Sequence, residues 1–140
     1  MRVECFLDTN VVVYAAAADS DTNKRERALD LLERAAFGTS AQVLQEVYVA
    51  VVRKLAVPLE PETALEWIEQ LAVFPCVAVD SAIVRIAIEK SERYRISFWD
   101  AAILAAAEAL DAKVLYTEDL NDGQLYGSVR AVNPFRVASY

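Results

Sequence analysis

Short apolar segments alternate with patterns typical of helices along most of the chain. Residues 2–7 form an apolar run that ends at Asp8, Thr9 and Asn10, which favour caps and turns before an alanine-rich stretch. Further short strands are expected at residues 37–39, 73–79, 113–116 and 129–132. This order predicts an α/β fold with a mainly parallel sheet, whose ligand sites lie beyond the carboxyl ends of its strands.

Helices are expected where a capping residue precedes apolar positions at helical spacing. The expected helices follow residues 19–22, run from Ser40 to about Leu55, run from Pro61 to Leu71, begin after Asp80 or Ser81, and span residues 98–110 after Ser97. The chain has 140 residues, of which 56% are hydrophobic, and this is enough for a proper core. We therefore expect one domain spanning residues 1–140.

The composition limits the chemistry that is available to the chain. Histidine is absent, which excludes histidine-based general acid–base ribonucleases and hydrolases with a Ser-His-Asp or Cys-His arrangement. Cys5 and Cys76 lie in apolar strand-like runs, where a cysteine is usually a small buried hydrophobe, so neither a disulfide nor a zinc site is expected. Any chemistry must therefore use carboxylates, hydroxyls or metals.

The charge balance is acidic, with 14 basic and 21 acidic residues and a net charge of −7. This argues against a protein that binds nucleic acid through phosphate neutralisation alone. The objection weakens if several carboxylates converge on divalent cations, because the bound ions reverse the local sign of the field. No apolar run approaches the roughly 20 residues of a membrane span, and residues 1–4 do not resemble a secretory signal, so a cytoplasmic protein is expected.

Two aspartates directly follow expected strands. Asp8 ends the first one, where a parallel sheet presents polar side chains to a crevice, although Asp-Thr-Asn is an equally good helix cap and both roles stay open. Asp119 lies in the oxygen-rich segment 117–123. Counted from Asp119, glycine is fifth and Arg130 twelfth, which does not fit a calcium-binding EF-hand loop. An ordinary solvated turn remains the alternative for Asp119.

Two further carboxylates lie on expected helices. Asp100 is surrounded by apolar residues, and a buried carboxylate needs a donor, a cation or a metal. Ser97 and Asp100 also have the spacing of a capping box, but we favour a site role. Glu46 lies nearly opposite the main apolar stripe of its helix, where a solvated glutamate would look the same.

Four segments together resemble the PIN domain, and more narrowly the VapC-type toxins of bacterial and archaeal toxin–antitoxin pairs. The matching segments are residues 6–10 (FLDTN), 40–46 (SAQVLQE), 96–101 (ISFWDA) and 115–119 (LYTED). The resemblance spans nearly the whole chain and implies a three-layer sandwich with a central, mainly parallel sheet flanked by helices. It implies a metal-binding and catalytic quartet of Asp8, Glu46, Asp100 and Asp119, supported by Thr9, Asn10 and Thr117.

The activity implied by the resemblance is a metal-dependent endoribonuclease. A carboxylate cluster without histidine or cysteine suits Mg²⁺ or Mn²⁺ far better than Zn²⁺. The metal would lower the pKa of a bound water and stabilise charge on the phosphate and the leaving oxygen. Many relatives place a further Asp two residues after Asp119, whereas this chain has Asn121 followed by Asp122.

The resemblance also implies partners. These are an RNA substrate, a small antitoxin protein that covers the groove, and a second copy of the chain, with self-association suiting the apolar segments 43–55 and 64–71. Lys90, Arg93 and Arg95 precede Asp100 and could hold RNA phosphates, although a short charge run is more often a solvated face.

Other functions compete with the nuclease. One is a PIN fold kept as a protein-binding module without nuclease activity. Another is an aspartate-dependent phosphatase of the haloacid-dehalogenase type, which needs an Asp where this chain has Asn10. A phosphoacceptor receiver domain would require a paired acidic site at the first strand and a lysine after the last strands, and neither is present in the expected form.

Overall fold

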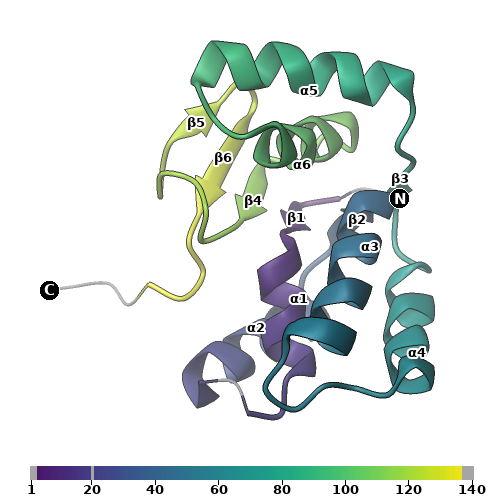
Figure 1. The fold of residues 1–140 in the computed structure, drawn as a ribbon. Helices are drawn as coiled ribbons and strands as arrows, with labels where there is room; N and C mark the ends of the chain where they lie inside the picture. Colours follow the sequence, from purple (N-terminus) through teal and green to yellow (C-terminus); the bar gives the residue numbers. More distant parts are fainter. Residues whose placement is uncertain (1–2, 20, 137–140) are drawn as a thin grey trace, which may run out of the picture.

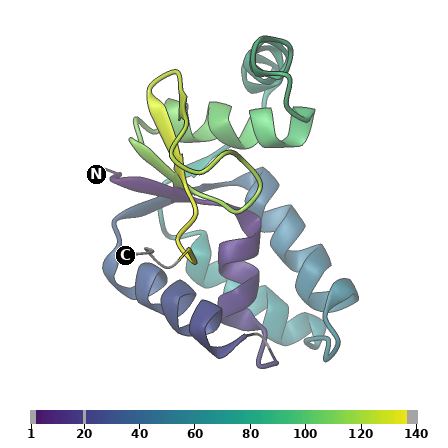
Figure 2. The same ribbon diagram turned by 90° about the vertical axis from the view of Figure 1, so that its left-hand side faces the viewer.

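A central sheet with helices on both faces makes up the computed structural model, which describes residues 3–19 and 21–136 (Figures 1 and 2). The strands are β1 (Cys5–Leu7), β2 (Phe37–Ser40), β3 (Cys76–Val77), β4 (Val114–Tyr116), β5 (Leu125–Tyr126) and β6 (Val129–Val132). Their order is β3-β2-β1-β4-β6-β5, and every neighbouring pair is parallel except β5 and β6. The predicted α/β fold with a mainly parallel sheet is confirmed.

The helices form the two outer layers. They are α1 (Thr9–Ala16), α2 (Thr22–Arg34), α3 (Ala41–Val49), the π-helix η1 (Ala50–Lys54), α4 (Pro61–Leu71), α5 (Ser81–Tyr94) and α6 (Phe98–Ala109). Helices α5 and α6 cover one face of the sheet, and α1 to α4 lie on the other (Figures 1 and 2). Within the described residues, no helix combines the length and apolarity needed to cross a membrane.

The predicted helix starts agree with the observed caps. The Oγ of Ser40 accepts a hydrogen bond from Val43 N (3.2 Å), and the Oγ of Ser97 accepts one from Asp100 N (3.1 Å). Between Asp80 and Ser81, it is Asp80 that caps α5, through Ile83 N (3.0 Å). Such side-chain acceptors satisfy backbone N–H groups that the first turn of a helix leaves without a partner.

Two predicted boundaries differ from the structure, and one element was not predicted. The helix expected to reach Leu55 ends as an α-helix at Val49 and continues as η1. Of residues 73–79 only β3 pairs, at the edge of the sheet, and Cys76 is exposed rather than buried as expected. The hairpin of β5 and β6 was not expected; it turns through Gly127, whose φ of 63° suits glycine. Arg2 of the first expected strand and Ser20 lie outside the described residues.

The core lies around β1, which pairs with β2 on one side and β4 on the other. Phe6 and Leu7 are fully buried, as are Phe37 on β2 and Leu115 on β4, because helices cover both faces of these parallel strands. Helix α6 buries every residue of 101–107. Leu7 pairs with Tyr116 in the sheet. The residues that follow these two strands therefore lie next to each other at the carboxyl ends of the strands.

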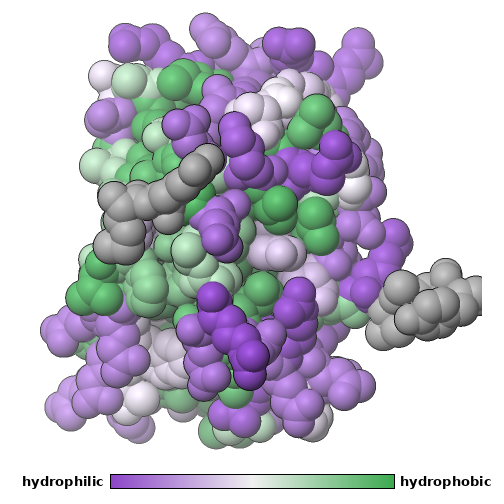
Figure 3. Space-filling view, turned by 180° about the vertical axis from the view of Figure 1, so that it is seen from behind, coloured by the Kyte–Doolittle hydropathy of each residue, from purple (hydrophilic) through white to green (hydrophobic). Residues whose placement is uncertain are grey.

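The outer surface is less uniformly polar than the charge suggests. Figure 3 shows apolar and weakly polar residues across the middle of the face opposite to that of Figure 1, with hydrophilic residues along its upper and lower margins. Several large hydrophobic side chains are exposed in the structure, among them Leu65 on α4 and Ile88 on α5. These two side chains are on helices that cover opposite faces of the sheet.

Candidate metal centre

Asp8 and Thr117 lie side by side where β1 and β4 end. The Oγ1 of Thr117 donates a hydrogen bond to Asp8 Oδ2 (2.7 Å), and the backbone N of Thr9 donates to Asp8 Oδ1 (2.7 Å). Both side chains are buried. Asp8 therefore caps α1, and the same two bonds fix the direction of its carboxylate.

All four predicted carboxylates line one cavity of about 390 Å³, which we call the acidic cavity. The lining residues include Asp8, Thr9, Asn10, Gln45, Glu46, Lys54, Trp99, Asp100 and Asp119. They come from the end of β1, from α3 and η1, from the first turn of α6 and from the loop after β4. The structure thus brings together residues that lie far apart in the sequence, including the expected supporting residues Thr9 and Asn10.

The four carboxylates are buried to different degrees. Asp8 is buried, Glu46 and Asp100 are half-buried, and Asp119 is exposed. Asp100 therefore faces the acidic cavity from the helix surface rather than lying inside the packed part of α6. Glu46, for which a solvated position had been equally plausible, accepts hydrogen bonds from Thr9 Oγ1 (3.3 Å) and Gln42 Nε2 (3.4 Å).

Burial and mutual repulsion favour the protonated form of two of these groups. Burial raises the pKa of Asp8 to about 7, opposed by the hydrogen bonds from Thr117 and Thr9 and reinforced by the charges of Asp119 and Asp100. The pKa of Asp100 is also raised, first by burial and then by the charge of Asp119, while Ser97 lowers it. Among the described residues, no ion pair involves any of the four carboxylates. The cavity thus brings four carboxylates together without an ion pair among the described residues.

The donor set fits a hard divalent cation. All candidate ligands are oxygens, which Mg²⁺ and Mn²⁺ prefer, and a cation here would oppose the burial and the repulsion that raise the pKa of Asp8. As the side chains stand, no three acidic or cysteine residues in the described parts of the chain are close enough to hold one ion together. The fit of the site to a divalent cation therefore rests on its oxygen donors and not on a preformed coordination geometry.

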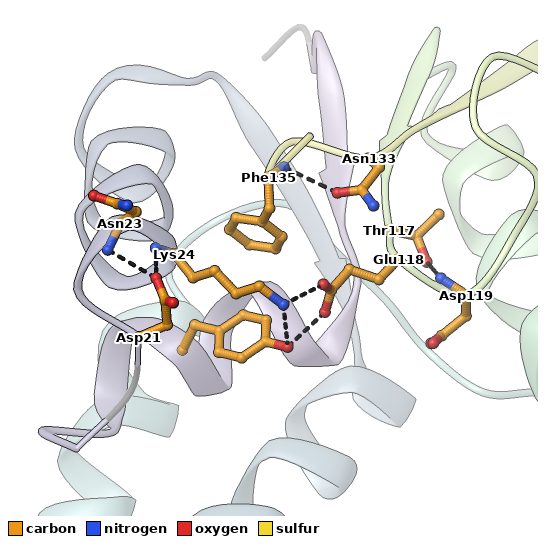
Figure 4. Close-up of polar contacts among 9 residues, drawn as sticks. Asp21, Asn23, Lys24, Thr117, Glu118, Asp119, Asn133 and Phe135 are labelled. Carbon is orange, nitrogen blue, oxygen red and sulfur yellow. Dashed lines mark hydrogen bonds and ion pairs between the residues drawn. The ribbon is translucent and has the colours of Figure 1, made fainter. Parts of the chain in front are cut away.

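Glu118 lies between two site residues but belongs to a different environment. Its Oε2 pairs with Lys24 Nζ (2.7 Å), its Oε1 accepts from Tyr14 OH (2.6 Å), and Lys24 also donates to Tyr14 OH (3.2 Å). We call these three residues the lysine cluster. Figure 4 shows Glu118 directed toward Lys24, whereas Asp119 points away from the cluster. The backbone N of Asp119 donates to Thr117 Oγ1 (3.1 Å), which ties it to the residue that holds Asp8.

The PIN domain family model matches residues 5–122 of the chain. The chain belongs to the PIN-domain family. A search of curated proteins finds no significant match to this PIN domain. Solved structures do resemble it, and they share its fold at low sequence identity.

Three of these structures are a toxin, a toxin–antitoxin complex and FitAcB. VapC20 of Mycobacterium tuberculosis, a toxin that cleaves the sarcin–ricin loop, is 22% identical with a TM-score of 0.69, and the match covers 91% of this chain and 99% of that one. For a toxin–antitoxin complex from Klebsiella pneumoniae the identity is 19%, the TM-score 0.72 and the coverage 96% and 100%. FitAcB from Neisseria gonorrhoeae is 22% identical with a TM-score of 0.66, and the match covers 95% of this chain and 99% of that one.

The basic residues that could have held RNA phosphates beside the metal, although a solvated face was favoured for them, lie elsewhere in this PIN domain. Lys90 pairs with Glu108 (2.7 Å), and with Arg93 it lines a separate cavity of about 420 Å³ between α5, α6 and the β5–β6 turn. Arg95 ends α5 in a left-handed conformation. Asp122 pairs with Arg136 (3.2 Å) rather than lining the acidic cavity.

Sequence reasoning missed several residues of the site. Lys54 and Trp99 line the acidic cavity, and Gln42 joins Glu46 to the backbone oxygen of Trp99 (3.2 Å). Trp99 had a signal in the sequence, since it is a large aromatic residue directly before Asp100. Lys54 had none, because its position depends on the π-helix.

Proposed function

We propose that this PIN domain is a divalent-metal-dependent endoribonuclease that hydrolyses RNA phosphodiesters. Its proposed catalytic and metal-binding residues are the carboxylates of the acidic cavity, Asp8, Glu46, Asp100 and Asp119, and the proposed ion is Mg²⁺ or Mn²⁺. The observation that carries this proposal is their convergence on one cavity without an ion-paired cation among the described residues. A protein that needed these groups only for stability would pair them, because unpaired carboxylates raise each other's pKa.

Each side chain has a task that follows from its contacts. Asp8, held by Thr117 and Thr9, would provide a fixed ligand at the bottom of the cavity. Glu46, oriented by Thr9 and Gln42, would face it from α3. When bound, the metal lowers the pKa of a water and stabilises charge that develops on the phosphate.

We further propose that the chain is the cytoplasmic toxin of a toxin–antitoxin pair. The support is the likeness to structures described as toxin–antitoxin complexes, together with the family. A homodimer is proposed on the exposed apolar side chains of α3 and α4, among them Tyr48, Val49 and Leu65. These lie in the segments that the sequence indicated for self-association.

The test of the nuclease is cleavage of a mixed RNA pool with Mg²⁺ or Mn²⁺ and with EDTA. Asp8→Asn and Asp100→Asn should each lower the rate by about 100-fold or more, because each removes one candidate ligand. The matched control is Asp111→Asn, which removes a charge at an exposed position whose φ of 56° suits asparagine. Circular dichroism checks that the variants fold.

Each outcome separates the candidate functions. Metal-dependent cleavage that both site variants lose and the control keeps supports the proposal. Cleavage that survives EDTA or both substitutions would overturn it. A folded protein that binds Mn²⁺ but cuts no RNA would favour the protein-binding module instead.

A further inference from the structure

An exposed tryptophan lines the acidic cavity. Trp99 is in the first turn of α6, directly before Asp100, and its exposed fraction is 65%. The indole is packed edge-on against Phe98, with ring centroids 5.1 Å apart and an interplanar angle of 86°. A large aromatic side chain that stays in solvent at a cavity is informative, because burial would have stabilised the fold.

The backbone of Trp99 is tied to the neighbouring wall of the cavity. Gln42, a buried residue of α3, donates to the Trp99 oxygen (3.2 Å) and to Glu46 (3.4 Å). One amide therefore links the position of Trp99 to that of a candidate metal ligand. The exposed ring is carried on a fixed support at a defined place beside the carboxylates.

Lys54 provides the positive charge of the cavity. It is the only basic residue among the described residues that line it, and within residues 3–19 and 21–136 it forms no ion pair. It ends η1, whereas Trp99 begins α6, and these two elements lie on opposite faces of the sheet (Figure 1). The acidic cavity is thus bordered by an aromatic ring from one layer and an ammonium group from the other.

These two side chains match the two chemical parts of a single-stranded nucleotide. Aromatic side chains stack on bases that are not paired or stacked in a duplex, and a lysine contacts the phosphate backbone as a point charge. A duplex keeps its base faces covered and offers only phosphates. In a protein with a net charge of −7, such local attraction counters the general repulsion of RNA.

We propose that Trp99 and Lys54 form a subsite for an unpaired nucleotide next to the phosphodiester that is cut. The indole of Trp99 stacks on the base and the ammonium of Lys54 contacts a backbone phosphate. This inference rests on the proposed function, and it goes beyond it by naming two residues of this chain that would hold an unpaired nucleotide. Neither residue takes part in the chemical step.

The first test uses the fluorescence of Trp99. Trp67 is the other tryptophan of the chain, so a Trp67→Phe variant reports Trp99 alone. Adding Asp119→Asn slows cleavage while Mg²⁺ is present. A 12-nucleotide single strand should quench this fluorescence, and the same sequence as a duplex should not. A Trp99→Phe variant, which keeps Trp67, is the matched control and should show no quenching.

The second test measures KM and kcat for cleavage of a single-stranded RNA. Trp99→Ala should raise KM by about tenfold, with the loss falling mainly on KM, and Trp99→Phe should restore most of it because a smaller ring still stacks. Lys54→Met should lower the slope of log affinity against log salt by about 0.7, as expected for one phosphate contact on a single strand. Lys113→Met, an exposed lysine directly before β4, should leave this slope unchanged.

The outcomes distinguish this inference from the proposed nuclease. If the wild type cuts RNA but Trp99→Ala keeps its KM and the single strand causes no quenching, the subsite is wrong and the nuclease stands. Quenching by the single strand in a protein that cuts nothing supports the subsite and overturns the nuclease. Equal quenching by the duplex would overturn the assignment to unpaired nucleotides. If replacing Trp99 weakened the binding of a protein partner and left RNA binding unchanged, the subsite would be wrong.

Discussion

Glu118 and Asp119 are neighbours in the chain, yet they lie in regions with opposite electrostatics. Glu118 belongs to the lysine cluster, where Lys24 and Tyr14 satisfy both of its oxygens. Asp119 lines the acidic cavity, where the described carboxylates have no ion-pair partner. The difference teaches that the role of a carboxylate depends on whether the protein itself provides its counter-charge.

The separation of these two residues follows from the backbone. Both residues lie in a bend after β4, where the side chain of Glu118 turns toward Lys24 and that of Asp119 turns away from it (Figure 4). The lysine cluster thereby anchors this loop to α1 and α2, while the same loop presents Thr117 and Asp119 to Asp8. One short segment serves both stability and the site.

The strongest way to sharpen this comparison is to titrate Asp8 in the metal-free protein. Its pKa is about 7 in the folded state against an ordinary value of 3.8, so the folded state binds the proton more tightly. This contribution to stability is present below pH 4 and is lost as the pH rises to about 7, by on the order of 4 kcal/mol. Urea unfolding in EDTA from pH 4 to 8 should show this decline in the wild type and a much flatter profile in Asp8→Asn. If stability fell equally with pH in the wild type and in Asp8→Asn, the raised pKa of Asp8 would be contradicted.

A second test replaces each of the two neighbours in turn and compares the effects on cleavage and on stability. Asp119→Asn should lower RNA cleavage by about 100-fold and change stability little, because it removes a candidate ligand that is exposed. Glu118→Gln should keep cleavage within a few-fold and lower stability by on the order of 1 kcal/mol, because Lys24 loses its ion pair. Single-turnover cleavage and urea unfolding measure the two effects. If Glu118→Gln lost as much activity as Asp119→Asn, the comparison would fail.

A third test adds a divalent cation to the protein. At a free Mn²⁺ concentration of about 100 times its Kd, binding to the folded state alone should stabilise the wild type by about 2.7 kcal/mol. Asp8→Asn should lose most of this gain, and Glu118→Gln should retain it. The melting temperature at about pH 7.5, with Mn²⁺ and with EDTA, reports the difference. Equal stabilisation of both variants would place the metal outside the acidic cavity.

The smallest expected effect concerns the hydroxyl of Tyr14. Tyr14→Phe should destabilise the fold by about 1 kcal/mol, because the hydroxyl donates to Glu118 (2.6 Å) and accepts from Lys24 (3.2 Å). The affinity for Mn²⁺ should not change. Tyr48→Phe, at an exposed position on α3, is the matched control and should have no measurable effect. Urea unfolding and calorimetric Mn²⁺ titration test both statements.

Local chemistry explains what could be predicted from the sequence. The caps at Ser40 and Ser97, the strand before Asp8 and the one before Asp119 all depend on neighbouring residues, and these predictions are confirmed. Together with the family resemblance, they indicated the four carboxylates that line the acidic cavity. Their role as metal ligands stays a prediction.

The remaining features depend on contacts between distant residues. Lys24 and Glu118 are 94 residues apart, and an amphipathic pattern on α2 gives no sign of the pair. Cys76 lies in an apolar run, but its strand is at the edge of the sheet, where the tertiary arrangement leaves it exposed. Lys90 and Arg93 precede Asp100 in the chain, yet the turn into α6 places them at another cavity.

The π-helix η1 has a consequence for how the chain tolerates insertions and deletions. A turn that closes with one residue more than an α-helical turn alters the direction of every side chain after it. Deleting one residue from Ala50–Lys54 would restore α-helical spacing and rotate the later side chains of this helix by about 100°. Val51, which η1 buries in the core, would be displaced, and the lysine at the end of η1 would turn away from the carboxylates. A change in length at this turn would therefore affect the packing of the core and the lining of the acidic cavity together.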